Sequence, residues 1–148
     1  MEVREQLNEF LTDIFNGILK LEEKSLKKYS DFSLSIAEMH IIEKIGQSKE
    51  IRMSDLAKAI RVTLGTVTVS INRLVKKGYI ERSQIVHDRR VVLIKLTSKG
   101  TAVFRLHEIF HRKMVDEIVL GLTPNEESIL AKALGNLANY FKGLELKD

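Results

Sequence analysis

The residues whose types and spacing are best suited to catalysis are His107, Glu108 and His111, within the stretch HEIFH. On a helix the two histidines would lie one turn apart and could share a zinc ion, with Glu108 as a general base, as in zinc peptidases. However, this pattern fixes only three letters and recurs by chance, and most of the 148 residues carry a different pattern. We therefore predict that the protein is not an enzyme, with a zinc peptidase as a remote alternative.

A second group of functional side chains occupies residues 62–74, VTLGTVTVSINRL, which alternate apolar and polar like a strand for only part of their length. A helix over residues 63–77 explains more of the stretch. Thr63 is a suitable N-cap for this helix, and Gly78 is a natural residue to follow its last turn. The helix would bury Val67, Ile71, Leu74 and Val75 on one face.

The opposite face of this helix would carry small residues at its N-terminal end, basic residues further on, and no acidic residue. Small residues allow close approach to DNA, and threonine can bond a phosphate or touch a thymine methyl group. Asparagine can pair with adenine and arginine with guanine. We therefore predict that the helix lies in a major groove, with contacts from Thr63, Gly65, Thr66, Thr68, Val69, Asn72, Arg73 and Lys76.

The distribution of charge agrees with such a face. Residues 61–105 carry ten Lys or Arg against two acidic residues, whereas the rest of the chain carries 14 basic and 18 acidic residues. A basic centre between acidic ends is typical of a surface that binds a polyanion. Charge alone leaves open the alternative of an ordinary solvated surface.

The residues before this helix predict a helix-turn-helix. A short helix over residues 54–60 would turn into it through the next two residues. An earlier helix is expected to begin between Ser33 and Ile36 and to end at Gly46, a residue type that often ends helices. Residues 51–53 are expected to be an apolar connector between the two.

The residues after it predict a β-hairpin wing. Two β-rich runs, residues 79–86 and 91–96, flank the polar letters HDRR, which we expect at the tip. Arg89 and Arg90 are predicted to enter a minor groove, where A·T tracts concentrate negative potential. Asp88 is expected to support the tip, either by pairing with a wing arginine or simply by forming the turn.

Both ends of the chain are predicted to be amphipathic helices with heptad-like apolar seams. The first covers residues 1 to about 28, a long helix runs from its cap at Thr97 to Gly121, and a capping box at Thr123 starts the last helix. Two such apolar seams are more than a monomer of this size needs to form its core, so we predict an interlocked homodimer. The predicted dimerisation residues are Leu7, Leu11, Ile14, Ile18, Leu130, Leu134, Leu137 and Phe141.

The composition predicts a cytoplasmic protein with DNA, and not a membrane, as its partner. Cysteine is absent, and the N-terminal residues lack the basic start and apolar run of a signal peptide. No apolar stretch approaches the ~20 residues that span a membrane.

Two motifs connect the chain to a known family. DxR is present as Asp88-Arg89-Arg90, and LTxxG is present as Leu96-Thr97-Ser98-Lys99-Gly100. With these motifs, residues 54–100 resemble the winged helix-turn-helix core of the MarR family of bacterial regulators. The resemblance implies a mainly α fold with a small β-hairpin wing and a pseudo-palindromic, A·T-rich double-stranded DNA operator. It also implies dimerisation helices in residues 1–32 and 98–148 around a winged helix-turn-helix domain in residues 33–97, interlocked as one domain.

The stretches LGTVTVSINRLVKKGYIER, EMHIIEKIG and RLHEIFHRKMV further resemble the fatty-acid-biosynthesis repressors of Gram-positive bacteria within this family. That resemblance implies control of type II fatty-acid synthesis genes, with long-chain acyl-acyl carrier protein as corepressor. Apolar and histidine side chains could then line an effector pocket, although they could equally pack the core. The candidate pocket residues are Phe15, His40, Ile42, Phe104, His107, Phe110 and His111.

The chain also resembles zinc-responsive members of the family, which leaves a second effector open. In that case the protein would control metal uptake and would hold a regulatory zinc ion. The ligands would be His40, His107 and His111, with Glu22 or Glu23. We expect no metal or other cofactor as the first hypothesis. A helical dimerisation module that does not bind DNA is the alternative of another functional class.

Overall fold

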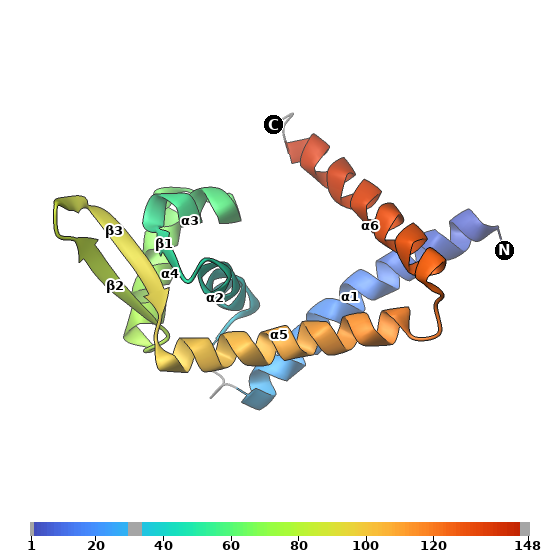
Figure 1. The fold of residues 1–148 in the computed structure, drawn as a ribbon, viewed down its shortest axis with the longest axis horizontal. Helices are drawn as coiled ribbons and strands as arrows, with labels where there is room; N and C mark the ends of the chain where they lie inside the picture. Colours follow the sequence, from blue (N-terminus) through green and yellow to red (C-terminus); the bar gives the residue numbers. More distant parts are fainter. Residues whose placement is uncertain (1, 30–33, 146–148) are drawn as a thin grey trace. The chain divides into compact units, whose positions relative to one another are not determined.

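The computed structural model describes residues 2–29 and 34–145, which form helices and one small sheet (Figure 1). This architecture confirms the predicted fold class. None of the described helices is apolar enough over a sufficient length to cross a membrane. The expected domain boundary between residues 32 and 33 lies outside the described residues. The elements are α1 (Val3–Tyr29), α2 (Ile36–Ser48), β1 (Glu50–Arg52), α3 (Met53–Ile60), α4 (Leu64–Lys76), β2 (Ile80–Ile85), β3 (Asp88–Leu96), α5 (Ser98–Val119) and α6 (Pro124–Glu145).

The chain divides into two compact units, Met1–Phe110 and His111–Asp148, with the boundary inside α5. In the second unit, α6 begins with the predicted capping box. Thr123 Oγ1 accepts a hydrogen bond from the Glu126 N–H at 3.4 Å, and Glu126 Oε2 accepts one from the Thr123 N–H at 2.8 Å. The division into dimerisation and DNA-binding segments stays a prediction, because it concerns how two copies of the chain assemble.

The core of the first unit lies between α2, α3, α4 and the sheet. Helix α4 contributes the apolar face that its 3.6-residue spacing predicted, since Val67, Ile71 and Leu74 are fully buried. Val75, which was predicted on the same face, is only partly buried. The other fully buried side chains include Met39, Ile42, Ile45, Leu56, Tyr79 and Ile94.

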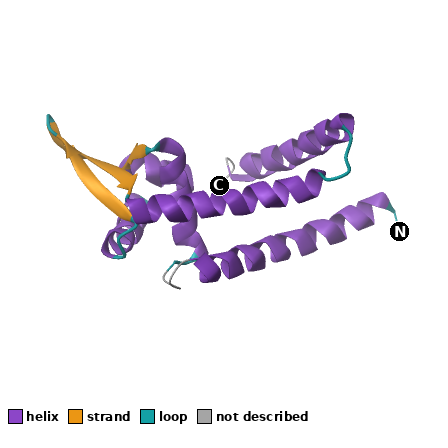
Figure 2. Ribbon diagram, turned by 60° about the horizontal axis from the view of Figure 1, so that its bottom comes forward, coloured by secondary structure: helices purple, strands orange, loops and turns teal. Residues whose placement is uncertain are grey.

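The sheet has three antiparallel strands in the order β1-β3-β2, with β3 in the centre. The predicted hairpin is present, and Figure 2 shows it as an arm that extends beyond helices α2, α3 and α4. However, its turn is Val86 and His87, and Asp88 already begins β3. The expected connector over residues 51–53 is also corrected, because Glu50–Arg52 pairs with β3 as a third strand.

Helix α2 continues two residues beyond its predicted end at Gly46. The helix ends at Ser48, because the next residue, the C-cap Lys49, has a φ of 61° and leaves the helical region. Gly46 has a different role, because the Phe104 ring packs so close to it that a Cβ would overlap the ring. The close packing of α5 against α2 at this position, and not the end of a helix, therefore explains why residue 46 is a glycine.

Candidate nucleic-acid interface

Helices α3 and α4 form the predicted helix-turn-helix. Arg61 ends α3 in the left-handed conformation with a φ of 57°, and the Val62 N–H donates to the Ala57 carbonyl at 3.1 Å. Thr63 then caps α4 as predicted, because its Oγ1 accepts a hydrogen bond from the Thr66 N–H at 3.2 Å. This short turn fixes where α4 starts relative to α3.

The other end of α4 is held by the start of α5. Gly78 follows α4 with a φ of 85°, a conformation that favours glycine. Thr97 Oγ1 donates to the Gly78 carbonyl at 2.6 Å and accepts from the Gly100 N–H at 3.1 Å. A Cβ on Gly100 would overlap the Tyr79 carbonyl oxygen. The LTxxG motif therefore caps α5 and brings it against the residues that end α4.

A largely buried carboxylate, Glu38, lies in the first turn of α2. It accepts a hydrogen bond from the Ser35 N–H at 2.9 Å, and its own N–H donates to Ser35 Oγ at 3.1 Å. Burial by itself raises the pKa of Glu38, but the hydrogen bonds from Ser35 and from the Lys77 ammonium together outweigh burial and lower this pKa. The carboxylate is therefore ionised at neutral pH.

The outer face of α4 is exposed and carries no acidic residue. Thr68, which is also in the predicted set, is half-buried. Its Oγ1 lies 2.7 Å from the Leu64 carbonyl oxygen and 3.4 Å from Met53 Sδ. The hydroxyl is thus engaged within the protein. The predicted contact residues that are fully on the exposed face are Thr63, Gly65, Thr66, Val69, Asn72, Arg73 and Lys76.

On the wing, Arg89 and Arg90 are exposed in the first residues of β3. Asp88 Oδ1 accepts a hydrogen bond from the Arg90 backbone N–H at 2.9 Å. This contact is the turn-forming alternative that the sequence left open, and not the pairing with an arginine side chain. Asp88 therefore orders the backbone that carries Arg90.

A groove that the sequence did not predict lies between the wing and the start of α4. Its volume is about 210 Å³, and Leu64 and Arg90 lie on its two sides. Arg52 and Ser54 reach it from the junction of β1 and α3. Arg52 escaped prediction because residues 51–53 were expected to be a connector, which assigns its side chain no direction, and Ser54 was expected only as the start of the short helix.

Two imidazole–carboxylate pairs join α1, α2 and α5 within the first unit. His40 Nε2 lies 3.7 Å from Glu22 Oε2, and His107 Nε2 lies 3.8 Å from Glu43 Oε2. Glu22 and His107 are buried, and the ring centroids of the two histidines are 6.4 Å apart. Of the two acids considered from the sequence, Glu22 therefore lies at the histidines, whereas Glu23 forms an exposed pair within α1.

The predicted effector-pocket residues lie in different surroundings within the fold. Ile42 is fully buried in the core, and Phe104 packs against that core. Phe110 instead stacks on His107, with ring centroids 6.3 Å apart. His111 follows His107 by one turn of α5, as the spacing predicted.

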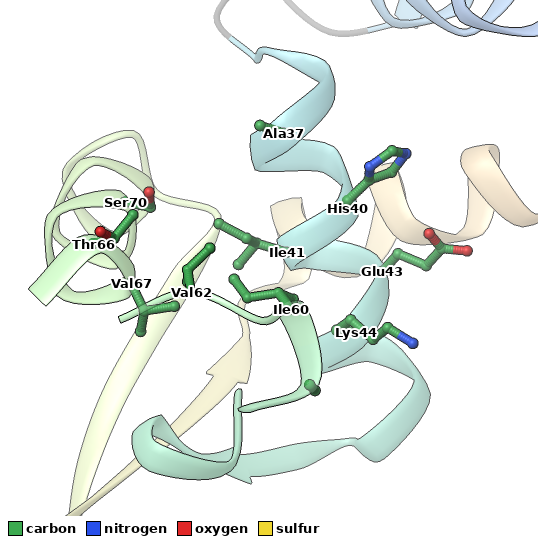
Figure 3. Close-up of a pocket in the computed structure, with 11 residues that line it drawn as sticks. Ala37, His40, Ile41, Glu43, Lys44, Ile60, Val62, Thr66, Val67 and Ser70 are labelled. Carbon is green, nitrogen blue, oxygen red and sulfur yellow. The ribbon is translucent and has the colours of Figure 1, made fainter. Parts of the chain in front are cut away.

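A cavity of about 510 Å³ lies elsewhere, between α2, α3 and α4 (Figure 3). His40 lines it, and no other residue predicted for the effector pocket does. Its wall is apolar where Ile41, Ile60 and Val62 contribute, while Thr66 and Ser70 reach it from α4. An occupant of this cavity would contact α4 directly.

The predicted dimerisation residues form apolar seams that a single chain leaves largely open. Ile18 of α1 and Leu130 and Leu137 of α6 are partly buried. The others are 36 to 54% exposed, and they are Leu7, Leu11, Ile14, Leu134 and Phe141. Phe15, which was predicted for the effector pocket, is also 49% exposed on α1.

Comparison with known proteins gives a consistent picture. The sequence model of the MarR family matches residues 34–92. The chain is 30% identical over 131 residues to the multiple antibiotic resistance protein MarR of Escherichia coli, covering 80% of this chain and 91% of that protein. It is similar to the crystal structure of Streptococcus pneumoniae FabT in complex with DNA, with a TM-score of 0.88, 43% identity, and 95% and 99% of the two chains covered. It is also similar to a mutant E. coli MarR complexed with operator DNA, with a TM-score of 0.60, 25% identity, and 93% and 99% covered.

Proposed function

The chain belongs to the MarR family of transcriptional regulators, and we propose that it is a dimeric repressor that binds a pseudo-palindromic, A·T-rich operator. The observation that carries this proposal is the exposed, acid-free face of α4, which is held at both ends. Such a face suits a major groove, where Asn72 and Arg73 would contact base edges. Arg90, and Arg89 beside it, would enter the adjacent minor groove.

Dimerisation is part of the proposal because the seams of α1 and α6 leave large apolar side chains in water. A second copy of the chain would cover them. A two-fold dimer would present two α4 helices to half-sites about 34–36 Å apart. The palindromic operator follows from that symmetry.

The DNA-binding proposal is tested by selecting bound sequences from genomic fragments and measuring affinity by fluorescence anisotropy. We expect tight, salt-sensitive binding to the selected duplex and weaker binding to a scrambled one. Asn72→Ala should relax this preference more than it lowers affinity for scrambled DNA. A uniform loss across sequences would contradict base contact by Asn72. If no salt-dependent DNA binding is seen, the chain is better explained as a dimerisation module.

We further propose that the regulated genes are those of type II fatty-acid synthesis and that long-chain acyl-acyl carrier protein is the corepressor. The similarity to FabT over nearly the whole chain supports this proposal. The acyl chain would enter near His40, where the apolar cavity and the imidazole–carboxylate pairs meet. Its binding would favour the arrangement of the two α4 helices that fits DNA.

The corepressor is tested by adding long-chain acyl-acyl carrier protein to the protein and its selected duplex. We expect tighter DNA binding, whereas carrier protein without an acyl chain should leave the affinity unchanged. If the acylated carrier has no effect or loosens the complex, this corepressor is wrong while DNA binding stands. Selected operators upstream of genes unrelated to lipid synthesis would count against the same proposal.

The contacts around Glu22 favour a second candidate, a zinc-responsive regulator of metal uptake. The ligand atoms of Glu22 and His107 lie within 4.8 Å of each other, and His40 lies beside Glu22. Imidazole and carboxylate groups suit zinc. Metal analysis of the purified protein, with His107→Ala as the control, tests this candidate. No retained zinc and no effect of added zinc on operator affinity would exclude it.

A further inference from the structure

Val69 lies at the centre of the exposed face of α4, and 52% of its surface is accessible. The residues one turn away on either side are Gly65, Thr66, Asn72 and Arg73, and all four are exposed. The core side of the helix is filled without Val69. Its isopropyl group therefore contributes little to folding and faces outward among small, polar and basic neighbours.

Gly65 precedes Val69 by one turn on the same face of α4, and as a glycine it has no side chain to cover Val69. Side chains on a helix lean toward its N-terminus, so the Val69 methyl groups lie over the turn that contains Gly65. A Cβ added at Gly65 would meet only Thr63 Oγ1, at 4.0 Å. The Val69 methyl groups therefore form a small apolar surface in the middle of the exposed face of α4, and this surface is accessible to a planar group of a binding partner.

Two threonines near Val69 on α4 have hydroxyl groups that are engaged within the protein. Thr66 Oγ1 lies 2.9 Å from Thr63 Oγ1, which makes it part of the N-terminal cap. Thr68 is half-buried, with its hydroxyl at the Leu64 carbonyl. Each of these threonines carries a polar hydroxyl beside its methyl group, whereas Val69, at the centre of the face, offers only apolar surface.

The edges of base pairs in the major groove carry one apolar group, the C5-methyl of thymine. A donor or acceptor of another base, pressed against an isopropyl group, would lose its hydrogen bond to water without gaining another. We propose that Val69 recognises the C5-methyl group of one thymine in each half-site of the operator. This inference rests on the proposed DNA-binding function, and it assigns Val69 a role in sequence specificity.

The test uses duplexes obtained by selection with the full-length protein, in which each thymine in turn is replaced by deoxyuridine. This replacement removes only the C5-methyl group. For wild type we expect one thymine per half-site whose replacement weakens binding about fourfold, the loss that corresponds to one buried methyl group. For Val69→Ala the same replacement should weaken binding less than about twofold, because the methyl group has then lost its contact.

Val115→Ala is the matched control, because Val115 of α5 is also 52% exposed and lies outside the α4 face. This variant should keep the wild-type pattern of thymine sensitivity, whatever its overall affinity. If no position loses its methyl sensitivity in Val69→Ala, the role of Val69 is overturned while DNA binding stands. If wild type does not distinguish the selected duplex from a scrambled one, the proposed function is overturned and this inference with it.

Discussion

Lys77 Nζ lies 2.9 Å from each carboxylate oxygen of Glu38, which ties the residue that ends α4 to the first turn of α2. Glu38 is largely buried and also completes the capping box of α2, whereas the Lys77 side chain is 32% exposed. The pair thus joins the end of the proposed DNA-binding helix to the helix that carries much of the core. Its strength should therefore be measurable in the stability of the fold.

We expect Lys77→Met to lower the free energy of unfolding by about 1–2 kcal/mol, because Glu38 would keep its burial but lose its cation. Urea unfolding at pH 7 and at fixed protein concentration measures this change. The matched control is Lys95→Met, which breaks the half-exposed pair of Lys95 with Glu81 at 3.1 Å. That loss should stay below about 1 kcal/mol, and equal losses in the two variants would contradict the prediction.

The lowered pKa of Glu38 predicts a dependence of stability on pH. A carboxyl group whose pKa is lower in the folded state stabilises the fold above its ordinary pKa. That contribution is lost as pH falls through the ordinary value toward the folded one. We therefore expect the stability difference between wild type and Glu38→Gln to shrink between about pH 5 and pH 3. A difference that stays constant over this range would show that Glu38 does not contribute as proposed.

Gly100→Ala should destabilise the fold by about 1–3 kcal/mol, because the new Cβ would overlap the Tyr79 carbonyl oxygen and push α5 away. Gly135 of α6 provides the control, since a Cβ there meets open space in the single chain. Gly135→Ala should be neutral or stabilising by up to about 1 kcal/mol, as expected for alanine inside a helix. Thermal or urea unfolding of both variants checks the contrast.

The proposed interface includes the wing through Arg90. We expect Arg90→Ala to weaken binding to the selected A·T-rich duplex by about 1–3 kcal/mol, because the side chain would no longer reach the minor groove. Fluorescence anisotropy at one fixed salt concentration measures this loss. An unchanged affinity would remove the wing from the proposed interface.

Asp88 should affect DNA affinity only by ordering the backbone of Arg90, because its carboxylate accepts a hydrogen bond from the Arg90 backbone N–H. Asp88→Asn keeps an acceptor oxygen and should bind like wild type, whereas Asp88→Ala should bind more weakly. If both variants bind equally weakly, the charge of Asp88 matters and the backbone hydrogen bond is not the reason for its presence.

Helix α4 could be predicted because its evidence is local. The spacing of Val67, Ile71 and Leu74, the cap at Thr63 and the glycine at 78 all lie within a few turns of one another. Strand β1 could not be predicted in this way. Three residues are too few to show an alternating pattern, and they form a strand only because β3 offers an open edge for pairing.

Gly46 shows the same limit for a single residue. A glycine near the end of a helical pattern usually marks its end, and that expectation was wrong here because the reason for this glycine is Phe104 of α5. The candidate effector residues illustrate a related limit of the sequence. Ile42 and Phe104 are apolar, and an apolar residue in a sequence does not reveal whether it fills the core or lines a cavity.

Two kinds of interaction determine the candidate DNA-binding face. The sequence by itself determines its helix, its caps and its lack of acidic residues, because helical hydrogen bonds and side-chain spacing act within about one turn. Tertiary contacts determine which side chains on the face remain exposed to a binding partner. Packing of α3 against α4 turned Thr68 toward Met53, pairing of β1 with β3 placed Arg52 beside the wing, and Val69 was left facing outward. These contacts join residues far apart in the chain, so only the folded structure reveals them.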